Sequence, residues 1–190
     1  GKLKALHDRF RQYACKLFEK HGIRNVGYWV PEKNPERKLY YLLAYPSREA
    51  RDVAWGALVR DPECMLIQRR TEQGGRLISK VDNVYLRKTD FSPPLDLGPS
   101  NAAPRVYQLC TYVTREGGID QLCTLFRDRA VSLLNDYDIS PIGFWVPSSG
   151  QEGEGNTLVC LVAHPHGANA DGRIEQAFRD LEWLASWESS

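Results

Sequence analysis

The sequence contains the same short pattern twice, Gly27-Tyr28-Trp29-Val30-Pro31 and Gly143-Phe144-Trp145-Val146-Pro147. In each copy a glycine precedes an alternating aromatic and β-branched run that stops at a proline, which is typical of a strand with a fixed end. The offset of 116 residues also holds upstream, where it aligns Leu6 with Leu122, Phe10 with Phe126 and Leu17 with Leu133. The chain is therefore predicted to be two copies of one unit.

Each copy is predicted to contain two helices. Leu6, Phe10, Tyr13 and Leu17 recur at steps of three and four residues, which indicates an amphipathic helix that Gly22 can close. A second helix is expected over 47–60 in the first copy, where Pro62 should break it, and over about 168–187 in the second copy.

The strands follow from runs of apolar residues. The runs 39–45 and 158–164 are apolar at consecutive positions, which predicts strands buried on both faces. Their offset is 119 residues, so the second hairpin loop, 148–156, is longer than the first. Further strands are predicted over 77–86, where apolar and polar residues alternate, and over 106–113.

The order strand, helix, strand, strand, helix, strand is that of a ferredoxin-like unit. The first strand of copy one and the last strand of copy two have no place in the chain, so each copy is one strand short. We predict a first repeat over 1–91, a linker rich in Pro, Gly, Ser and Ala over 92–104, and a second repeat over 105–190. Strand 77–86 is expected to pair with 106–113, and the exposed edge of 39–45 to pair with another copy or another chain.

Composition limits the partners of the chain. Lys and Arg number 25 against 24 Asp and Glu, a net charge of +1, so neither nucleic acid nor a membrane surface is expected to bind. No apolar run has the length of a membrane span. The five cysteines are scattered, which predicts neither a disulfide framework nor a zinc site and favours a reducing, cytoplasmic location.

The candidate metal and acid–base residues are few. His164-Pro165-His166 presents two imidazoles, but no third ligand is near in sequence, so no metal is expected. His21 is expected to be a solvated or capping histidine, and Asp61 and Glu63 to be solvated charges at a helix end. No cofactor-binding motif is present in the sequence.

A ligand site is predicted around six residues that occupy matched places in the two copies. The tryptophans could line a pocket, although core packing is the simpler explanation. Tyr45 and His164 place polar groups at the ends of apolar strands, and Tyr41 and Cys160 lie on the same strand faces by the two-residue period. The predicted ligand-binding residues are Trp29, Tyr41, Tyr45, Trp145, Cys160 and His164.

Several segments together resemble the NIPSNAP family: 10–11, 16–22, 27–29, 42–45, 60–63 and 84–93, with weaker similarity in the second copy. The resemblance implies an α+β fold in which two ferredoxin-like antiparallel sheets face each other as a dimeric α-β barrel. The wider barrel superfamily includes cofactor-independent monooxygenases and haem-handling enzymes, and some relatives act through protein partners. The chain departs from the family pattern at Tyr13 and Arg129, where a histidine is common, and at Cys64, where a tryptophan is usual.

Three functions follow as hypotheses. The first is a barrel protein without catalytic activity that binds a small apolar or aromatic ligand between its sheets. The second is a cofactor-independent or haem-dependent oxygenase that uses Tyr45, His164 and the two tryptophans around a substrate. The third is an interaction protein that uses its strand edges. The sequence favours a protein that is not an enzyme, and a homo-oligomer or a sheet completed by another chain.

Overall fold

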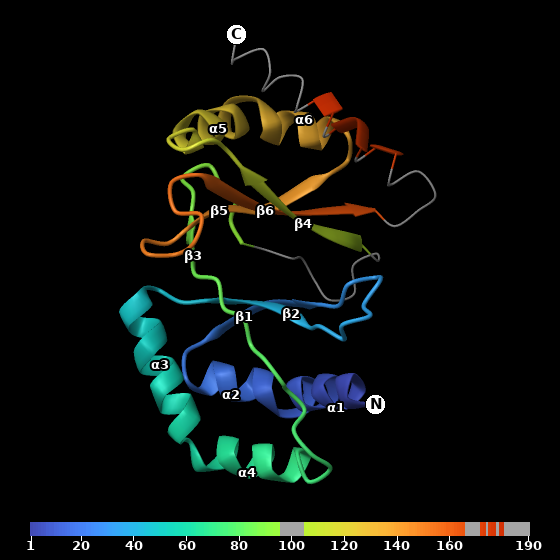
Figure 1. Cartoon of the computed structure of the whole chain (residues 1–190), viewed down its shortest axis with the longest axis vertical. Helices are drawn as coiled ribbons and strands as arrows, with labels where there is room; N and C mark the ends of the chain where they lie inside the picture. Colours follow the sequence, from blue (N-terminus) through green and yellow to red (C-terminus); the bar gives the residue numbers. More distant parts are fainter. Residues whose placement is uncertain (96–104, 166–171, 174, 178, 181–190) are drawn as a thin grey trace. The chain divides into compact units, whose positions relative to one another are not determined.

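The computed structural model describes residues 1–95, 105–165, 172–173, 175–177 and 179–180. The chain divides into two units, Gly1–Asp82 and Asn83–Ser190 (Figure 1). Each unit combines helices with an antiparallel sheet, so the predicted α+β class is confirmed. That the two sheets face each other stays a prediction.

The first unit begins with one continuous helical segment and then forms a hairpin and two further helices. Its elements are α1 (Lys2–Arg9), the π-helical turn η1 (Phe10–Ala14), α2 (Cys15–Lys20), β1 (Arg24–Trp29), β2 (Tyr40–Ala44), α3 (Arg48–Arg60) and α4 (Pro62–Thr71). The predicted apolar stripe packs as expected, because Leu17 and Phe18 are buried with Ile23, Leu58 and Ile67. Gly22, at a φ of 73°, ends the helix.

Helices α3 and α4 meet at a sharp boundary. The Ser47 hydroxyl caps α3 by accepting from the Ala50 amide at 3.1 Å. Asp61 then has extended backbone angles and caps α4, in which Pro62 is the first residue. Pro62 thus ends the first helix as predicted, but it also starts a second helix that the sequence analysis did not anticipate.

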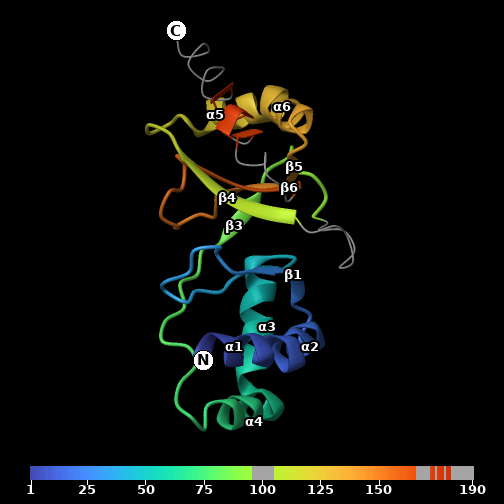
Figure 2. The ribbon, with the colours of Figure 1, turned by 90° about the vertical axis from the view of Figure 1, so that its right-hand side faces the viewer.

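The second unit is a four-stranded antiparallel sheet with helices on one face (Figure 1 and Figure 2). Its elements are β3 (Leu86–Lys88), β4 (Arg105–Val113), α5 (Ile119–Leu125), the π-helical turn η2 (Phe126–Ala130), α6 (Val131–Asp136), β5 (Ser140–Pro147) and β6 (Thr157–Pro165). The strand order is β3-β5-β6-β4. Phe126, Leu134, Phe144, Leu158 and Val162 form the core between helices and sheet. Of the helix predicted over 168–187, helical residues appear within 172–180, and the rest lies outside the described residues.

The two hairpins repeat each other in register. Gly27, Tyr28 and Trp29 pair with Leu42, Tyr41 and Tyr40, and by the sequence offsets these pairs become Gly143–Leu161, Phe144–Cys160 and Trp145–Val159, which the structure contains. Both hairpins shift register just before the glycine, between Asn25 and Gly27 and between Pro141 and Gly143.

The repeat extends to irregular backbone. The π-helical turns η1 and η2 occupy equivalent positions, Phe10–Ala14 and Phe126–Ala130. Each helix then ends at an equivalent position with a left-handed backbone conformation. This residue is Gly22 in the first copy and Asp138, at a φ of 60°, in the second. The amides of Ile23 and Ile139 reach back to the Phe18 and Leu134 carbonyls at the same distance, 2.9 Å. These shared irregularities indicate that the copies keep one backbone plan.

The strand predicted over 77–86 is the main error in the fold. Residues before Leu86 do not belong to a strand, and β3 covers Leu86–Lys88. β3 pairs with β5, whereas the expected partner was the strand predicted over 106–113, which is β4. Alternation predicts an extended chain, but a strand also needs a partner, and the residues that pair are those that reach β5.

The segment 85–92 belongs to the second unit. The Phe144 amide donates to the Ser92 hydroxyl at 2.9 Å, and the Thr89 amide donates to the Phe144 carbonyl at 3.0 Å. The Ser148 amide donates to the Tyr85 carbonyl at 2.8 Å. The two units divide after Asp82, and Ser92 is a buried residue. The repeats over 1–91 and 105–190 and the linker over 92–104 stay predictions.

Candidate functional site

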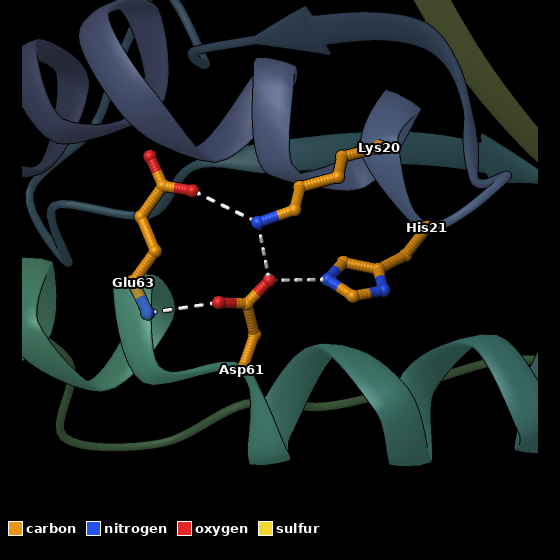
Figure 3. Close-up of polar contacts among 4 residues, drawn as sticks. All are labelled: Lys20, His21, Asp61 and Glu63. Atoms are coloured by element: carbon orange, nitrogen blue, oxygen red, sulfur yellow. Dashed lines mark hydrogen bonds and ion pairs between the residues drawn. The ribbon is translucent and has the colours of Figure 1, made fainter.

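Four polar side chains from two separate segments meet in the first unit (Figure 3). His21 Nε2 lies 2.8 Å from Asp61 Oδ2, and Lys20 Nζ lies 2.8 Å from the same oxygen. Lys20 also contacts Glu63 Oε2 at 3.0 Å, and the Glu63 amide donates to Asp61 Oδ1 at 2.8 Å. The end of α2 is thereby attached to the start of α4. We term Lys20, His21, Asp61 and Glu63 the Asp61 cluster.

Asp61 is the buried centre of the Asp61 cluster. Its side chain is 7% exposed, and that of His21 is 16% exposed. Hydrogen bonds from Lys20 and His21 and from the Glu63 backbone hold the pKa of Asp61 well below its usual range. The same contact with Asp61 raises the pKa of Lys20. Asp61 is therefore an ionised carboxylate, and the expectation that it is solvated was wrong.

The charge of Asp61 determines which ring nitrogen of His21 carries a hydrogen. A carboxylate can only accept hydrogen bonds, so Nε2 of His21 must donate. In neutral His21 the lone pair then lies on Nδ1, on the side of the ring away from Asp61 (Figure 3). This arrangement could support a general base, but a nucleophile or a substrate pocket would also be needed.

The second copy repeats the contact between His21 and Asp61 with different chemistry. Tyr137 and Asp180 occupy the positions of His21 and Asp61, and the Tyr137 hydroxyl donates to Asp180 Oδ2 at 2.6 Å. This hydrogen bond raises the pKa of Tyr137. Because the contact persists without an imidazole, its shared role is to attach one helix end to the next helix.

The charge on Asp61 should make the first unit sensitive to acid. A carboxyl whose pKa is lower in the folded state stabilises the fold above its unfolded pKa of about 3.9, and this stability is lost as the pH falls toward the folded pKa. We expect Asp61→Asn to destabilise the protein at pH 7, and the difference from wild type to shrink below about pH 4.

Denaturant unfolding at several pH values tests this prediction. Asp180→Asn is the matched control, because its partner Tyr137 is neutral and its effect should be smaller. A difference between Asp61→Asn and wild type that is constant from pH 7 to about pH 3 would contradict the assignment.

The predicted ligand residues of the first unit lie on two faces of the hairpin. Tyr41 packs against Phe10 at a ring distance of 5.6 Å, and Tyr45 packs against the core formed with the helices. Tyr28 also contacts Phe10, so Trp29, the next residue in the strand, lies on the opposite face. Trp29 is half-buried.

The second unit separates its predicted residues in the same way. Cys160 is part of the core against α5 and α6, and His164, four positions along β6, lies on the same face. Trp145 pairs with Val159 and therefore lies on the other face, where it is 7% exposed. Within each unit, the tryptophan and the other predicted residues do not line one surface.

Gly143 shows why a glycine precedes Trp145 by two positions. A Cβ atom on Gly143 would lie 2.3 Å from Cη2 of Trp145, so the indole ring rests on the glycine backbone. Gly143 pairs with Leu161, which places the ring beside that side chain. The repeated Gly-aromatic-Trp pattern is thus a packing motif in the second copy.

The family comparison covers the first unit and the start of the second. Residues 1–93 match the NIPSNAP family model. Over these residues the chain is similar to the NIPSNAP family. The comparisons with curated proteins and with solved structures gave no match.

The NIPSNAP segment contains both halves of the Asp61 cluster. The stretches 16–22 and 60–63, which carried the resemblance separately, meet through His21 and Asp61. The sequence analysis missed this contact because it examined the two segments independently. Among the described residues there is no group of three metal-ligating side chains and no helix suited to crossing a bilayer.

Proposed function

We propose that this NIPSNAP-like protein is an interaction protein that binds an extended segment of a partner chain along β4. The observation that carries the proposal is the exposure of apolar side chains on β4, the terminal strand of its sheet. Leu109 and Val113 are 58% and 68% exposed, and Thr111 between them is also exposed. Apolar surface on a long terminal strand favours pairing with another strand.

The two terminal strands of this sheet, β3 and β4, differ in how well they are protected against pairing with another strand. β3 has three residues, and two of them are Arg87 and Lys88, which oppose the addition of another strand. β4 has nine residues, and between Val106 and Val113 it contains neither a charged residue nor a proline. Of the two, β4 is therefore the edge suited to pairing.

The ferredoxin-like plan supports the same location. In that plan the second copy supplies its first three strands as β4, β5 and β6, and the fourth strand lies beside the first, antiparallel to it. A partner segment antiparallel to β4 would take this position. Its side chains on the face of Leu109 should be apolar, and those on the opposite face should match the half-buried Cys110 and Tyr112.

The oxygenase hypothesis receives less support. It requires Tyr45 and His164 to surround a substrate together with the tryptophans, but within each unit these residues lie on opposite sheet faces. The hypothesis of a small apolar ligand also receives less support, because the indole of Trp145 is buried and packs on Gly143. Native mass spectrometry of the purified protein tests it directly, through the mass of any retained molecule.

The strand-pairing proposal is tested with Leu109→Lys. A lysine on the edge should lower the recovery of a co-purified partner severalfold while leaving the fold intact, because Leu109 is mostly exposed. The partner is identified by a photo-reactive residue introduced at Thr111, which should cross-link to an extended segment. Affinity purification with quantitative mass spectrometry gives the readout.

Val53→Lys is the matched control. Val53 is 73% exposed on α3, in the other unit, and its substitution removes apolar surface without affecting a strand edge. Equal partner recovery from Leu109→Lys and wild type would refute the proposal. So would equal losses from Leu109→Lys and Val53→Lys.

A further inference from the structure

Two cysteines of the second unit lie directly opposite each other on adjacent strands. Cys110 of β4 pairs with Cys160 of β6 in the antiparallel register. Directly paired residues in such a ladder have Cα atoms about 4.5–5.5 Å apart, which lies within the range that a disulfide requires. Both side chains lie on the sheet face that packs against the helices.

The thiols are in contact and differ in environment. Cys160 is 1% exposed, whereas Cys110 is half-buried on the terminal strand. Their mutual hydrogen bond lowers the pKa of Cys110 and, together with burial, raises the pKa of Cys160. Cys110 is therefore the thiol that ionises first and that an oxidant reaches first.

We propose that Cys110 and Cys160 are a redox modification site that forms a reversible disulfide between β4 and β6 when the protein meets a peroxide. The inference does not depend on the proposed function, because it concerns the opposite face of β4. It also differs from a structural disulfide, since both residues are free cysteines in this structure.

The chemistry is balanced with hydrogen peroxide as the oxidant. The Cys110 thiolate attacks one peroxide oxygen, the O–O bond breaks, and hydroxide leaves to give a sulfenic acid. The Cys160 sulfur then attacks the Cys110 sulfur, which forms the S–S bond and breaks the S–O bond; the sulfenic hydroxyl takes the Cys160 proton and leaves as water. Two thiols and one peroxide give one disulfide and two waters. Cys160 needs no access to solvent, because its target is the sulfur that it already contacts.

The remaining cysteines provide an internal comparison. Burial raises the pKa of Cys64 and of Cys123, which slows their reaction as thiolates. No strand pairing of the described residues places Cys15, Cys64 or Cys123 opposite another cysteine. In the first copy the equivalent of Cys160 is Tyr41, so the pair is specific to the second copy.

The experiment treats the folded full-length protein with hydrogen peroxide, then denatures and alkylates it. The alkylated thiols should fall from five to three, the mass before alkylation should drop by two hydrogens, and peptide mapping should find Cys110 linked to Cys160. A phosphine reductant should restore five thiols. Because the bond closes a long loop, the melting temperature of the oxidised protein should rise by roughly 5–15 °C.

Cys110→Ser is the decisive variant. Serine is close in size to cysteine and the site is half-buried, so the protein should fold, and peroxide should leave all four remaining thiols outside any intramolecular disulfide. Cys64→Ser is the control and should still form the link. The proposal is overturned if wild type keeps five thiols, if Cys110 goes on to sulfinic acid without linking, or if the link forms only in unfolded protein.

Discussion

Phe144→Ala is expected to lower the free energy of unfolding of the second unit by about 3–5 kcal/mol. Phe144 is fully buried and packs against the rings of Phe126, at 5.7 Å, and Phe91, at 5.3 Å. Truncation leaves a cavity among these rings and also loosens the segment that contains Ser92, whose hydroxyl accepts from the Phe144 amide. Denaturant unfolding followed by far-UV circular dichroism measures the loss.

Tyr28→Ala, at the equivalent place in the first unit, is the matched control. Tyr28 is half-buried, although it packs against Phe10 and Tyr41 in a comparable aromatic group. We expect a smaller loss than for Phe144, because less apolar surface returns to water. A loss below about 1 kcal/mol for Phe144→Ala would contradict the described core of the second unit.

Gly143→Ala is expected to destabilise the second unit by about 1–3 kcal/mol, although alanine usually favours folding over glycine. The added methyl would lie 2.3 Å from the Trp145 ring, so the indole must leave its place on the sheet. A change in tryptophan fluorescence should accompany the loss. Gly74→Ala is the control, because nothing lies within 4 Å of its Cβ position.

A double-mutant cycle separates this clash from other effects. In a Trp145→Ala background there is no indole to displace, so Gly143→Ala should cost much less than in wild type. Additive costs of the two substitutions would show that the ring does not rest on Gly143.

The hairpin registers could be predicted because they follow from the repeat. Once Gly27 is aligned with Gly143 and Leu42 with Leu161, one hairpin fixes the pairing of the other. The glycine itself carries part of this information, since the packing of Trp145 needs a residue without a side chain at position 143.

Other features were less predictable for physical reasons. The π-helical turns leave the apolar stripe of each helix continuous, so periodicity does not detect them. Helix α4 had a usable signal, because Asp61 followed by Pro62 is a favourable start of a helix as well as a break. The position of β3 depends on a partner strand from the other copy, which no local pattern contains.

The candidate site was predictable in part. Burial of Trp145 on a sheet face follows from the alternating pattern. The contact between His21 and Asp61 does not, because it joins residues far apart in sequence, and each of them alone resembles an ordinary charge at a helix end.

Segment 85–92 belongs to the family match but is needed for the fold of the second unit. A gene rearrangement that carried residues 1–93 into another protein would preserve the family segment, but it would leave the Phe144 amide without its Ser92 acceptor and Arg127 without Asp90, which it contacts at 2.9 Å. By position, mutations in 85–92 fall within the family segment. Their effect on stability, and hence selection on them, should come from the folding of the second unit.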